Sequence, residues 1–245
     1  MSSDMTRPLA GRISVWMQEK VREAGAKGLV LGLSGGVDSS VVAALAKMAC
    51  GDNMLAIMMP CHSSPESAAH AELVARKLGI RTHLADLTTA YDAFVTHVPN
   101  NNGIELTNIR PRLRMAALYC VAQANHYLVV GTGNKSEKMI GYFTKWGDGA
   151  ADIAPIANLY KHEVYGLARE LGVPDEVINK PPTADLWAGQ TDENEIGMTY
   201  DELDAVIAGM ESGQVSDLDP KSVEKVRKMI AASEHKRHMP AVFEP

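Results

Sequence analysis

Near its N-terminus the chain reads Leu29-Val30-Leu31-Gly32-Leu33-Ser34-Gly35-Gly36-Val37-Asp38-Ser39-Ser40. The first five residues form an apolar run that is too short for a helix and typical of a strand buried on both faces of a parallel sheet. Ser34-Gly35-Gly36 breaks the run, and the residues from Val37 to Cys50 read as a helix rich in Val and Ala. We therefore expect a buried strand, a tight loop and a helix in succession.

Apolar runs and helical patterns continue to alternate after this unit. Met54 to Met59 reads as a second strand that Pro60 stops, which completes a βαβ unit. Strands that alternate with helices predict an α/β fold, with a doubly wound, mostly parallel sheet flanked by helices. The other expected segments are a first helix over Leu9–Ala24, helix–strand pairs at Pro65–Leu78 with Arg81–Leu87 and Arg110–Ala124 with Tyr127–Gly131, helical chain beyond Pro155 interrupted by the polar Lys180–Gly197, and a final stripe of Val223, Val226 and Ile230.

The composition suits one globular domain that spans residues 1–245. The 245 residues are 46% hydrophobic and 22% charged, which is enough apolar material for a single complete core. A net charge of -6 provides no general basic field for nucleic acid, so we expect no nucleic-acid partner.

Cysteine usage and hydropathy point to the cytoplasm. The three cysteines, Cys50, Cys61 and Cys120, form no CxxC pair and no metal-ligand spacing, which favours a reducing compartment. Met1 to Pro8 lacks the apolar run of a signal peptide. No stretch approaches the ~20 apolar residues of a membrane helix, so we expect no membrane association.

The loop after the first strand is suited to bind phosphate. Backbone N–H groups and the helix dipole at a strand-to-helix junction favour an anion, and Gly35 and Gly36 allow the backbone to approach closely. No Walker A lysine and no dinucleotide G-x-G-x-x-G is present. A carboxylate at a polyphosphate site repels its ligand unless a cation intervenes, so Asp38 is interpreted as a Mg²⁺ ligand. A plain glycine turn capped by serine is the alternative.

Ser34-Gly35-Gly36-Val37-Asp38-Ser39 resembles the pyrophosphate-binding loop of the N-type ATP-pyrophosphatases, which cleave ATP to AMP and pyrophosphate. That superfamily includes NAD⁺ synthetases, GMP synthetases, asparagine and argininosuccinate synthetases, and tRNA-modifying enzymes. The resemblance implies a Rossmann-like sheet of the adenine nucleotide alpha hydrolase type. It also implies that the loop binds ATP through Gly32, Leu33, Ser34, Gly35, Gly36, Val37, Asp38 and Ser39.

Two later motifs resemble those of the ammonia-dependent NAD⁺ synthetases. Gly131-Thr132-Gly133-Asn134-Lys135-Ser136-Glu137 resembles their GTxxxxE segment and follows a strand, at the sheet edge where open α/β folds bind ligands. Residues 144–152, TKWGDGAAD, resemble their TKYGDGGxD stretch and depart from it at Trp146 and Ala150. The resemblance implies that Thr132 contacts ATP, that Glu137 joins Asp38 on Mg²⁺, and that Lys145 and Asp152 bind deamido-NAD⁺. By itself, Glu137 would read as a solvated carboxylate at a helix start.

Further motifs complete this resemblance. In the NxxARxRM-like run Asn108 to Met115, Arg112 takes the place of an arginine that binds deamido-NAD⁺, and Arg110 or Arg114 is expected to pack instead. Residues 190–193, QTDE, also match. After Pro60 the chain departs from the family pattern, and His62 there reads as a ligand-facing or a solvated residue. The remaining implied contacts are Lys161 and Thr183 for ATP, and His235 and Lys236 for deamido-NAD⁺.

The resemblance implies an enzyme: an ammonia-dependent ligase that amidates deamido-NAD⁺ at the expense of ATP, through an acyl-adenylate, in the last step of NAD biosynthesis. It implies Mg²⁺ as cofactor, ATP, deamido-NAD⁺ and ammonia as small-molecule partners, and a homodimer. About 27 residues precede the first strand, so no glutaminase domain is expected. No general base is identified. Two rivals remain: a tRNA-modifying ATP-pyrophosphatase, which the net charge and absent CxxC disfavour, and a nonenzymatic ATP-binding module.

Overall fold

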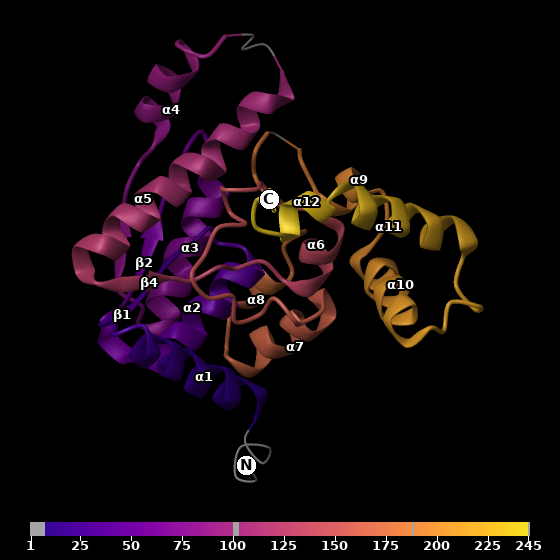
Figure 1. Ribbon diagram of the computed structural model, residues 1–245. Coiled ribbons are helices and arrows are strands. Elements are labelled where there is room, and N and C mark those ends of the chain that lie inside the picture. The colour runs from indigo at the N-terminus through magenta and orange to yellow at the C-terminus, as the bar shows by residue number, and fades with distance from the viewer. Residues whose placement is uncertain (1–7, 100–102, 188, 245) are drawn as a thin grey trace.

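A computed structural model describes residues 8–99, 103–187 and 189–244 (Figure 1). Most of the N-terminal segment Met1 to Pro8, and Ala188 in the polar tract, lie outside the described residues. None of the helices found in the described ranges is long and apolar enough to cross a membrane.

The centre of the fold is a parallel sheet with the strand order β3-β2-β1-β4. Its strands are β1 (Gly28–Gly32), β2 (Met54–Met58), β3 (Thr82–Leu84) and β4 (Tyr127–Val129). Val30 of β1 is in register with Leu55 on one side and Val129 on the other, so β1 lies inside the sheet. The predicted α/β fold with a mostly parallel sheet is therefore confirmed. The apolar run of β1 follows from its central position, because helices cover both faces of such a strand.

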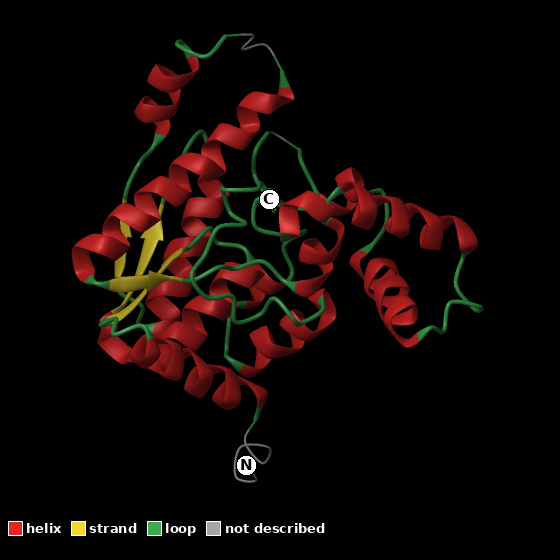
Figure 2. Ribbon diagram, viewed as in Figure 1, coloured by secondary structure: helices red, strands yellow, loops and turns green. Residues whose placement is uncertain are grey.

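Alternate residues of β1 pack into two different parts of the core. Leu29 and Leu31 belong to the cluster that contains α2, whereas Val30 packs on the other side, with Ala122 of α5. Helices thus cover both faces of the sheet (Figure 2). The helices around the first cluster are α1 (Leu9–Glu23), α2 (Val37–Cys50), α3 (Pro65–Leu78), α7 (Lys161–Glu170) and α8 (Asp175–Ile178), and the helix on the second is α5 (Ile109–Asn125).

A separate apolar cluster lies beyond the sheet and joins the C-terminal helices. Leu203 and Val206 of α10 (Tyr200–Ser212) pack against Val223 and Val226 of α11 (Pro220–Ala232), with Ile140 of α6 (Lys135–Ile140) beside them. Figure 1 shows α10 and α11 on the side of the molecule away from the sheet. The short helices α9 (Asp192–Ile196) and α12 (Glu234–Arg237) complete this region.

The structure differs from the sequence prediction at several boundaries. β3 stops at Leu84 instead of Leu87, and an unexpected helix α4 (Thr88–Val95) begins soon after it. The side chain of Asp86 accepts a 2.8 Å hydrogen bond from the Thr88 backbone, which favours a turn into this helix over a longer strand. A short 3-10 helix (Ile104–Asn108) leads into α5.

Candidate functional site

Gly35 lets the loop after β1 pack directly against α3. Its φ is +82°, and a Cβ at this position would stand 2.3 Å from the Ser67 carbonyl oxygen and 2.9 Å from the Ala71 nitrogen. Gly36 is different, because the nearest atom to a Cβ there would be the Ser34 Oγ at 3.4 Å. Only Gly35 is therefore required for the shape of the loop. Gly36 is the N-cap of α2, so the loop leads into the positive end of that helix.

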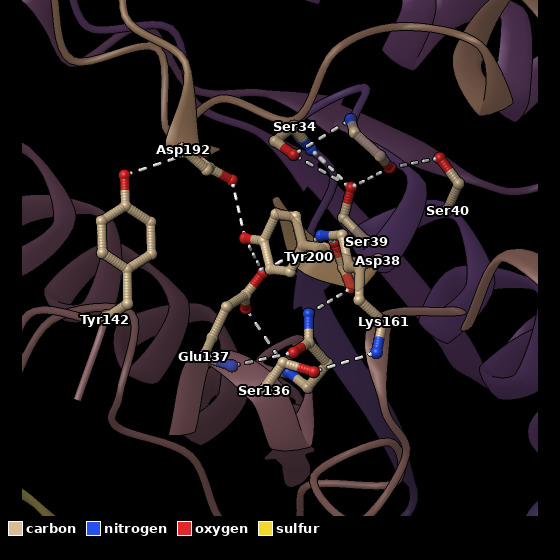
Figure 3. A network of polar contacts seen from close by, with 12 residues as sticks. Ser34, Asp38, Ser39, Ser40, Ser136, Glu137, Tyr142, Lys161, Asp192 and Tyr200 are labelled. Atoms are coloured by element: carbon tan, nitrogen blue, oxygen red, sulfur yellow. Dashed lines mark hydrogen bonds and ion pairs between the residues drawn. The ribbon is translucent and has the colours of Figure 1, made fainter. Parts of the chain in front are cut away.

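Hydroxyl groups hold this loop from inside (Figure 3). The Oγ atoms of Ser34 and Ser39 lie 3.0 Å apart, and both Ser39 and Ser40 donate to the Gly36 carbonyl, at 3.0 and 2.7 Å. The Gly36 N–H donates to Ser34 Oγ at 3.2 Å. Ser39 and Ser40 therefore act first on the loop backbone, while Ser34 is exposed to solvent.

Lys161 joins the two carboxylates that were predicted to hold the metal. Its Nζ lies 2.6 Å from Asp38 Oδ2 and 3.1 Å from Glu137 Oε1 (Figure 3). Lys161 is 1% exposed and begins α7, Asp38 lies in the first turn of α2, and Glu137 lies in the first turn of α6. Three predicted site residues from distant parts of the chain thus meet at one point, next to the serine loop.

The surroundings of the site favour the charged form of Lys161 and disfavour the charged form of its buried acids. Burial alone would lower the pKa of Lys161, but the charges of Asp38 and Glu137 outweigh it and raise that pKa. Burial raises the pKa of Glu137 against the opposing charge of Lys161, and the nearby charges of Asp38 and Asp192 raise it further. Burial also raises the pKa of Asp192. One ammonium therefore balances a set of three buried or half-buried acids only in part, which suits the site to an additional cation.

Asn134 is a site residue that the sequence analysis quoted but gave no role. It is fully buried, and its Nδ2 donates to Asp38 Oδ1 at 2.9 Å. Its Oδ1 accepts the backbone N–H of Glu137 at 3.0 Å, and the Glu137 side chain returns to the Asn134 backbone. This reciprocal capping box orients both carboxylates at once. The spacing Asn-x-x-Glu, which is a helix-start signal, could have predicted the cap.

A second group of predicted residues gathers around the start of α5. Arg112 Nη2 lies 3.4 Å from the Lys145 carbonyl oxygen, and Lys145 Nζ donates to the His235 carbonyl. The Lys145 ammonium also lies 5.4 Å from the ring centroid of Trp146. Arg112 is exposed, so its guanidinium presents positive charge to solvent, whereas Lys145 is half-buried.

Lys236 and Asp152 were also predicted to bind deamido-NAD⁺, but their side chains bond to other groups of the protein. Lys236 Nζ donates to the carbonyls of Gly141 and Phe143, at 2.8 and 2.9 Å, and so closes the turn after α6. Asp152 accepts the Val129 N–H at 2.7 Å and the Tyr119 hydroxyl at 3.3 Å. Burial, together with the Asp152 charge, raises the pKa of Tyr119 to about 12, so the phenol remains a donor.

Thr132 and Thr183, the other two residues predicted to bind ATP, lie in separate parts of the fold. Thr132 follows β4 at the carboxyl edge of the sheet, beside the loop that follows β1. Thr183 Oγ1 accepts the Asp185 N–H at 3.0 Å, and the Asp185 carboxylate accepts the Ser64 N–H at 2.9 Å. Thr183 therefore belongs to a segment that contacts the turn before α3.

The arginines on either side of Arg112 hold loops together. Arg114 donates to the Met59 carbonyl and to Ser63 Oγ, each at 3.0 Å. Arg110 donates to the Leu186 carbonyl at 2.7 Å and lies 5.2 Å from the ring centroid of Tyr91. Both of these arginines therefore contact other parts of the chain, whereas the sequence predicted packing for one or the other.

His62, which follows Pro60 where the sequence departs from the family pattern, makes specific contacts. Its Nε2 lies 2.7 Å from Asp92 Oδ1, and its ring meets Tyr91 edge-on with 5.6 Å between centroids. Its φ is +52°, which is uncommon for a residue other than glycine. His62 is therefore tied to α4 and is not simply solvated.

A parallel sheet with a loop of glycines and serines, and with two carboxylates and a lysine at its carboxyl edge, is typical of a nucleotide-binding α/β enzyme. The chain matches the NAD synthase family over residues 9–240 and belongs to that family. The NH(3)-dependent NAD(+) synthetase of Finegoldia magna is 45% identical over 233 residues, covering 95% of this chain and 94% of that protein. The enzyme of the same name from Carboxydothermus hydrogenoformans is 46% identical, with 93% of each chain covered.

Solved structures support the same family. The NMN synthetase of Francisella tularensis superposes with a TM-score of 0.89 at 35% identity and covers 96% of both chains. The NH3-dependent NAD synthetase of Campylobacter jejuni, solved with a nitrate ion, superposes with a TM-score of 0.84 at 30% identity, covering 96% of this chain and 98% of that one. The predicted family and fold class are therefore confirmed.

Proposed function

We propose that the chain forms NAD⁺ from deamido-NAD⁺ and ammonia while it cleaves ATP to AMP and pyrophosphate. This ATP-dependent amidation is the known reaction of the family to which the chain belongs. The observation that carries the proposal is the meeting of Asp38, Glu137 and Lys161 beside the serine loop, because this arrangement suits a metal-bound polyphosphate.

The reaction divides into two steps on one site. The nicotinate carboxylate attacks the α-phosphorus of ATP, an acyl-adenylate forms, and pyrophosphate leaves. Ammonia then attacks the acyl carbon, the amide forms, and AMP leaves. Neither step needs a nucleophilic side chain, so the protein aligns the reactants and balances charge. The groups proposed to contact ATP are the loop from Gly32 to Ser39, Thr132, Lys161 and Thr183.

Asp38 and Glu137 are the residues that would hold Mg²⁺. Both already converge on one cation, the Lys161 ammonium, and two carboxylates together with substrate phosphates are a common Mg²⁺ donor set. Bound there, Mg²⁺ would neutralise the charge that develops on the phosphates. Once another cation occupies the two carboxylates, the ammonium of Lys161 becomes available to the oxygens of ATP.

Arg112, Lys145, Asp152, His235 and Lys236 are proposed to bind deamido-NAD⁺. The support is the pair of cations formed by the exposed Arg112 and the half-buried Lys145 near the start of α5, which matches the charge of a dinucleotide pyrophosphate or a carboxylate. The contacts of Lys236 suggest a further role for this residue, because it fixes the turn from which Lys145 projects.

A smaller substrate is the second candidate. The similarity to the NMN synthetase of Francisella tularensis favours nicotinic acid mononucleotide, which lacks the AMP half of deamido-NAD⁺, as this second acceptor. The curated relatives at 45% and 46% identity favour the dinucleotide. Liquid chromatography of reactions with ATP, Mg²⁺, ammonium and either acceptor tests both proposals. A higher kcat/KM for the mononucleotide would make it the preferred acceptor. If neither acceptor gave an amide, the proposed function would be refuted.

We further propose a homodimer of single-domain chains in the cytoplasm. In support of a partner, only Pro111 and Ala122 are buried among the 17 residues of α5. The cysteines are free, which suits a reducing compartment. Light scattering during size-exclusion chromatography measures the mass of the particle, and a mass of one chain at micromolar concentration would refute the dimer.

A further inference from the structure

Tyr200 reaches the carboxylate site from a helix that none of the sequence motifs includes. It is the first residue of α10, is 5% exposed, and packs in the cluster that joins α6, α10 and α11. Its side chain nevertheless points to the polar site, where Figure 3 shows it between Glu137 and Asp192. A buried tyrosine with its hydroxyl in a charged site is positioned by the apolar cluster around its ring.

Tyr200 contacts both a carboxylate and the lysine of the site. Its hydroxyl lies 3.1 Å from Glu137 Oε1, the same oxygen that accepts from Lys161. The ammonium of Lys161 lies 4.6 Å from the centroid of the Tyr200 ring. The hydroxyl thus fixes the direction of one carboxylate oxygen, and the ring face stabilises the lysine charge through a cation–π contact.

Neighbouring residues hold Tyr200 in this orientation. Its backbone N–H donates to Glu193 Oε1 at 2.9 Å, and its hydroxyl also lies 3.1 Å from Asp192 Oδ2. Asp192 in turn accepts from the hydroxyl of Tyr142 at 3.1 Å. The Tyr200 hydroxyl has one proton and two carboxylate acceptors, and Asp192 already accepts from Tyr142, so donation of that proton to Glu137 leaves neither acid without a donor.

We propose that Tyr200 is a positioning residue for the metal site, whose hydroxyl orients Glu137 and whose ring holds Lys161. The proposal rests on the metal role proposed above for Asp38 and Glu137. Residues that hydrogen-bond to metal-binding carboxylates set the orientation of those ligands, and their loss lowers metal affinity roughly 10- to 100-fold. Tyr200→Phe removes the hydroxyl and leaves the ring beneath Lys161, so it isolates the contact to Glu137.

The test measures metal binding directly, by electron paramagnetic resonance of Mn²⁺ titrated into the full chain with a non-hydrolysable ATP analogue. Tyr200→Phe should weaken Mn²⁺ binding about 10- to 100-fold. Tyr142→Phe is the matched control: it removes one phenolic hydroxyl from the same chain of contacts but touches Asp192 and Glu195 instead of Glu137, and it should have a smaller effect. Circular dichroism verifies that each variant is folded.

A kinetic measurement separates positioning from a general loss of structure. Tyr200→Phe should raise the Mg²⁺ concentration for half-maximal rate while kcat at saturating Mg²⁺ stays within a few-fold of wild type, since excess metal fills a weakened site by mass action. Unchanged Mn²⁺ binding in Tyr200→Phe, together with weakened binding in Glu137→Gln, would overturn the positioning role alone. Unchanged binding in Glu137→Gln would refute the metal assignment itself, so the two failures are distinguishable.

Discussion

The ammonium of Lys161 lies 2.6 Å from the carboxylate of Asp38, although 123 residues separate them in the sequence. Glu137, 24 residues before Lys161, completes the group at 3.1 Å. The lysine thus joins the starts of three helices, α2, α6 and α7, at the carboxyl edge of the sheet. The two carboxylates therefore have a cation as partner in the absence of metal, and a change at any of the three residues should alter metal binding or stability.

We expect Asp38→Asn and Glu137→Gln each to abolish turnover while the fold survives. Each change removes one charged oxygen ligand from a site that otherwise attracts anions, so the metal loses its anchor. NAD⁺ formation across a Mg²⁺ titration measures the loss, and circular dichroism verifies folding. A folded variant that keeps nearly the wild-type rate at limiting Mg²⁺ would show that its carboxylate does not bind the metal.

Lys161→Met should destabilise the metal-free protein by about 3–5 kcal/mol, because it leaves charged carboxylates without their partner in a buried place. The pKa of Glu137 is already raised by burial, and loss of the lysine raises it further. A raised folded-state pKa gives stability that is present below the unfolded value of about 4.3 and is lost as pH rises through the folded value. The loss of unfolding free energy in Lys161→Met, relative to wild type, should therefore grow from acid to neutral pH.

Urea unfolding of both proteins at a series of pH values, in the presence of a chelator, measures that deficit. A Lys161→Met deficit that stayed constant from below the Glu137 pKa up to neutral pH would mean that the carboxylates do not sense the lysine charge. Lys135→Met is a suitable control, because Lys135 pairs with the more exposed Glu211 and should cost far less.

Gly35→Ala and Gly36→Ala should differ in stability although they are adjacent. An alanine at position 35 would have to adopt a positive φ, and its Cβ would stand against the Ser67 carbonyl. We therefore expect the free energy of unfolding to fall by about 1–3 kcal/mol. Position 36 leaves room for a Cβ, so its alanine variant should unfold at nearly the wild-type urea concentration. Equal midpoints for the two variants would mean that α3 moves freely away from the loop.

Arg112→Ala and Lys145→Ala should weaken deamido-NAD⁺ far more than ATP. The two cations lie close together near the start of α5, and loss of one charge-assisted contact costs about 1.5–3 kcal/mol. Calorimetric titration with each ligand measures the two affinities separately. Equal losses for ATP and deamido-NAD⁺ would contradict a separate dinucleotide site.

The sequence allowed the sheet and its loop to be predicted because their signals are local. The apolar run before Ser34 and the helix from Val37 to Cys50 were predicted from neighbouring residues alone, and the helix has those bounds in the structure. β3 was predicted too long, since a three-residue edge strand carries little apolar pattern and Asp86 ends it through a side-chain hydrogen bond. Local periodicity contains no information about such competing contacts.

The candidate site could be predicted only where a motif marked it. Asp38, Glu137 and Lys161 were selected from separate motifs, but nothing in the sequence indicated that one ammonium bridges both acids. Tyr200 escaped attention because it stands in a helix start that reads as ordinary core packing, and its link to Glu137 spans 63 residues. Long-range hydrogen bonds depend on how α6, α7 and α10 pack, which no local pattern encodes.

Free ammonia should support the reaction as the nitrogen donor, and the rate should depend on pH. The attacking species must be neutral NH₃, because the ammonium ion has no free lone pair. At a fixed, subsaturating total ammonium concentration, the rate should therefore climb as pH rises above neutral, until groups of the enzyme titrate.

Two controls separate the donor from the enzyme. Replotting the rates against the concentration of NH₃, instead of total ammonium, should bring the curves at different pH values together. The curated relatives carry the name NH(3)-dependent NAD(+) synthetase, so ammonia-free glutamine should give no NAD⁺ with the pure chain. Robust NAD⁺ formation from glutamine would refute the donor assignment. A flat pH profile at subsaturating ammonium would mean that adenylation or product release, and not the attack of ammonia, limits turnover, because only the attack depends on the fraction of nitrogen that is unprotonated.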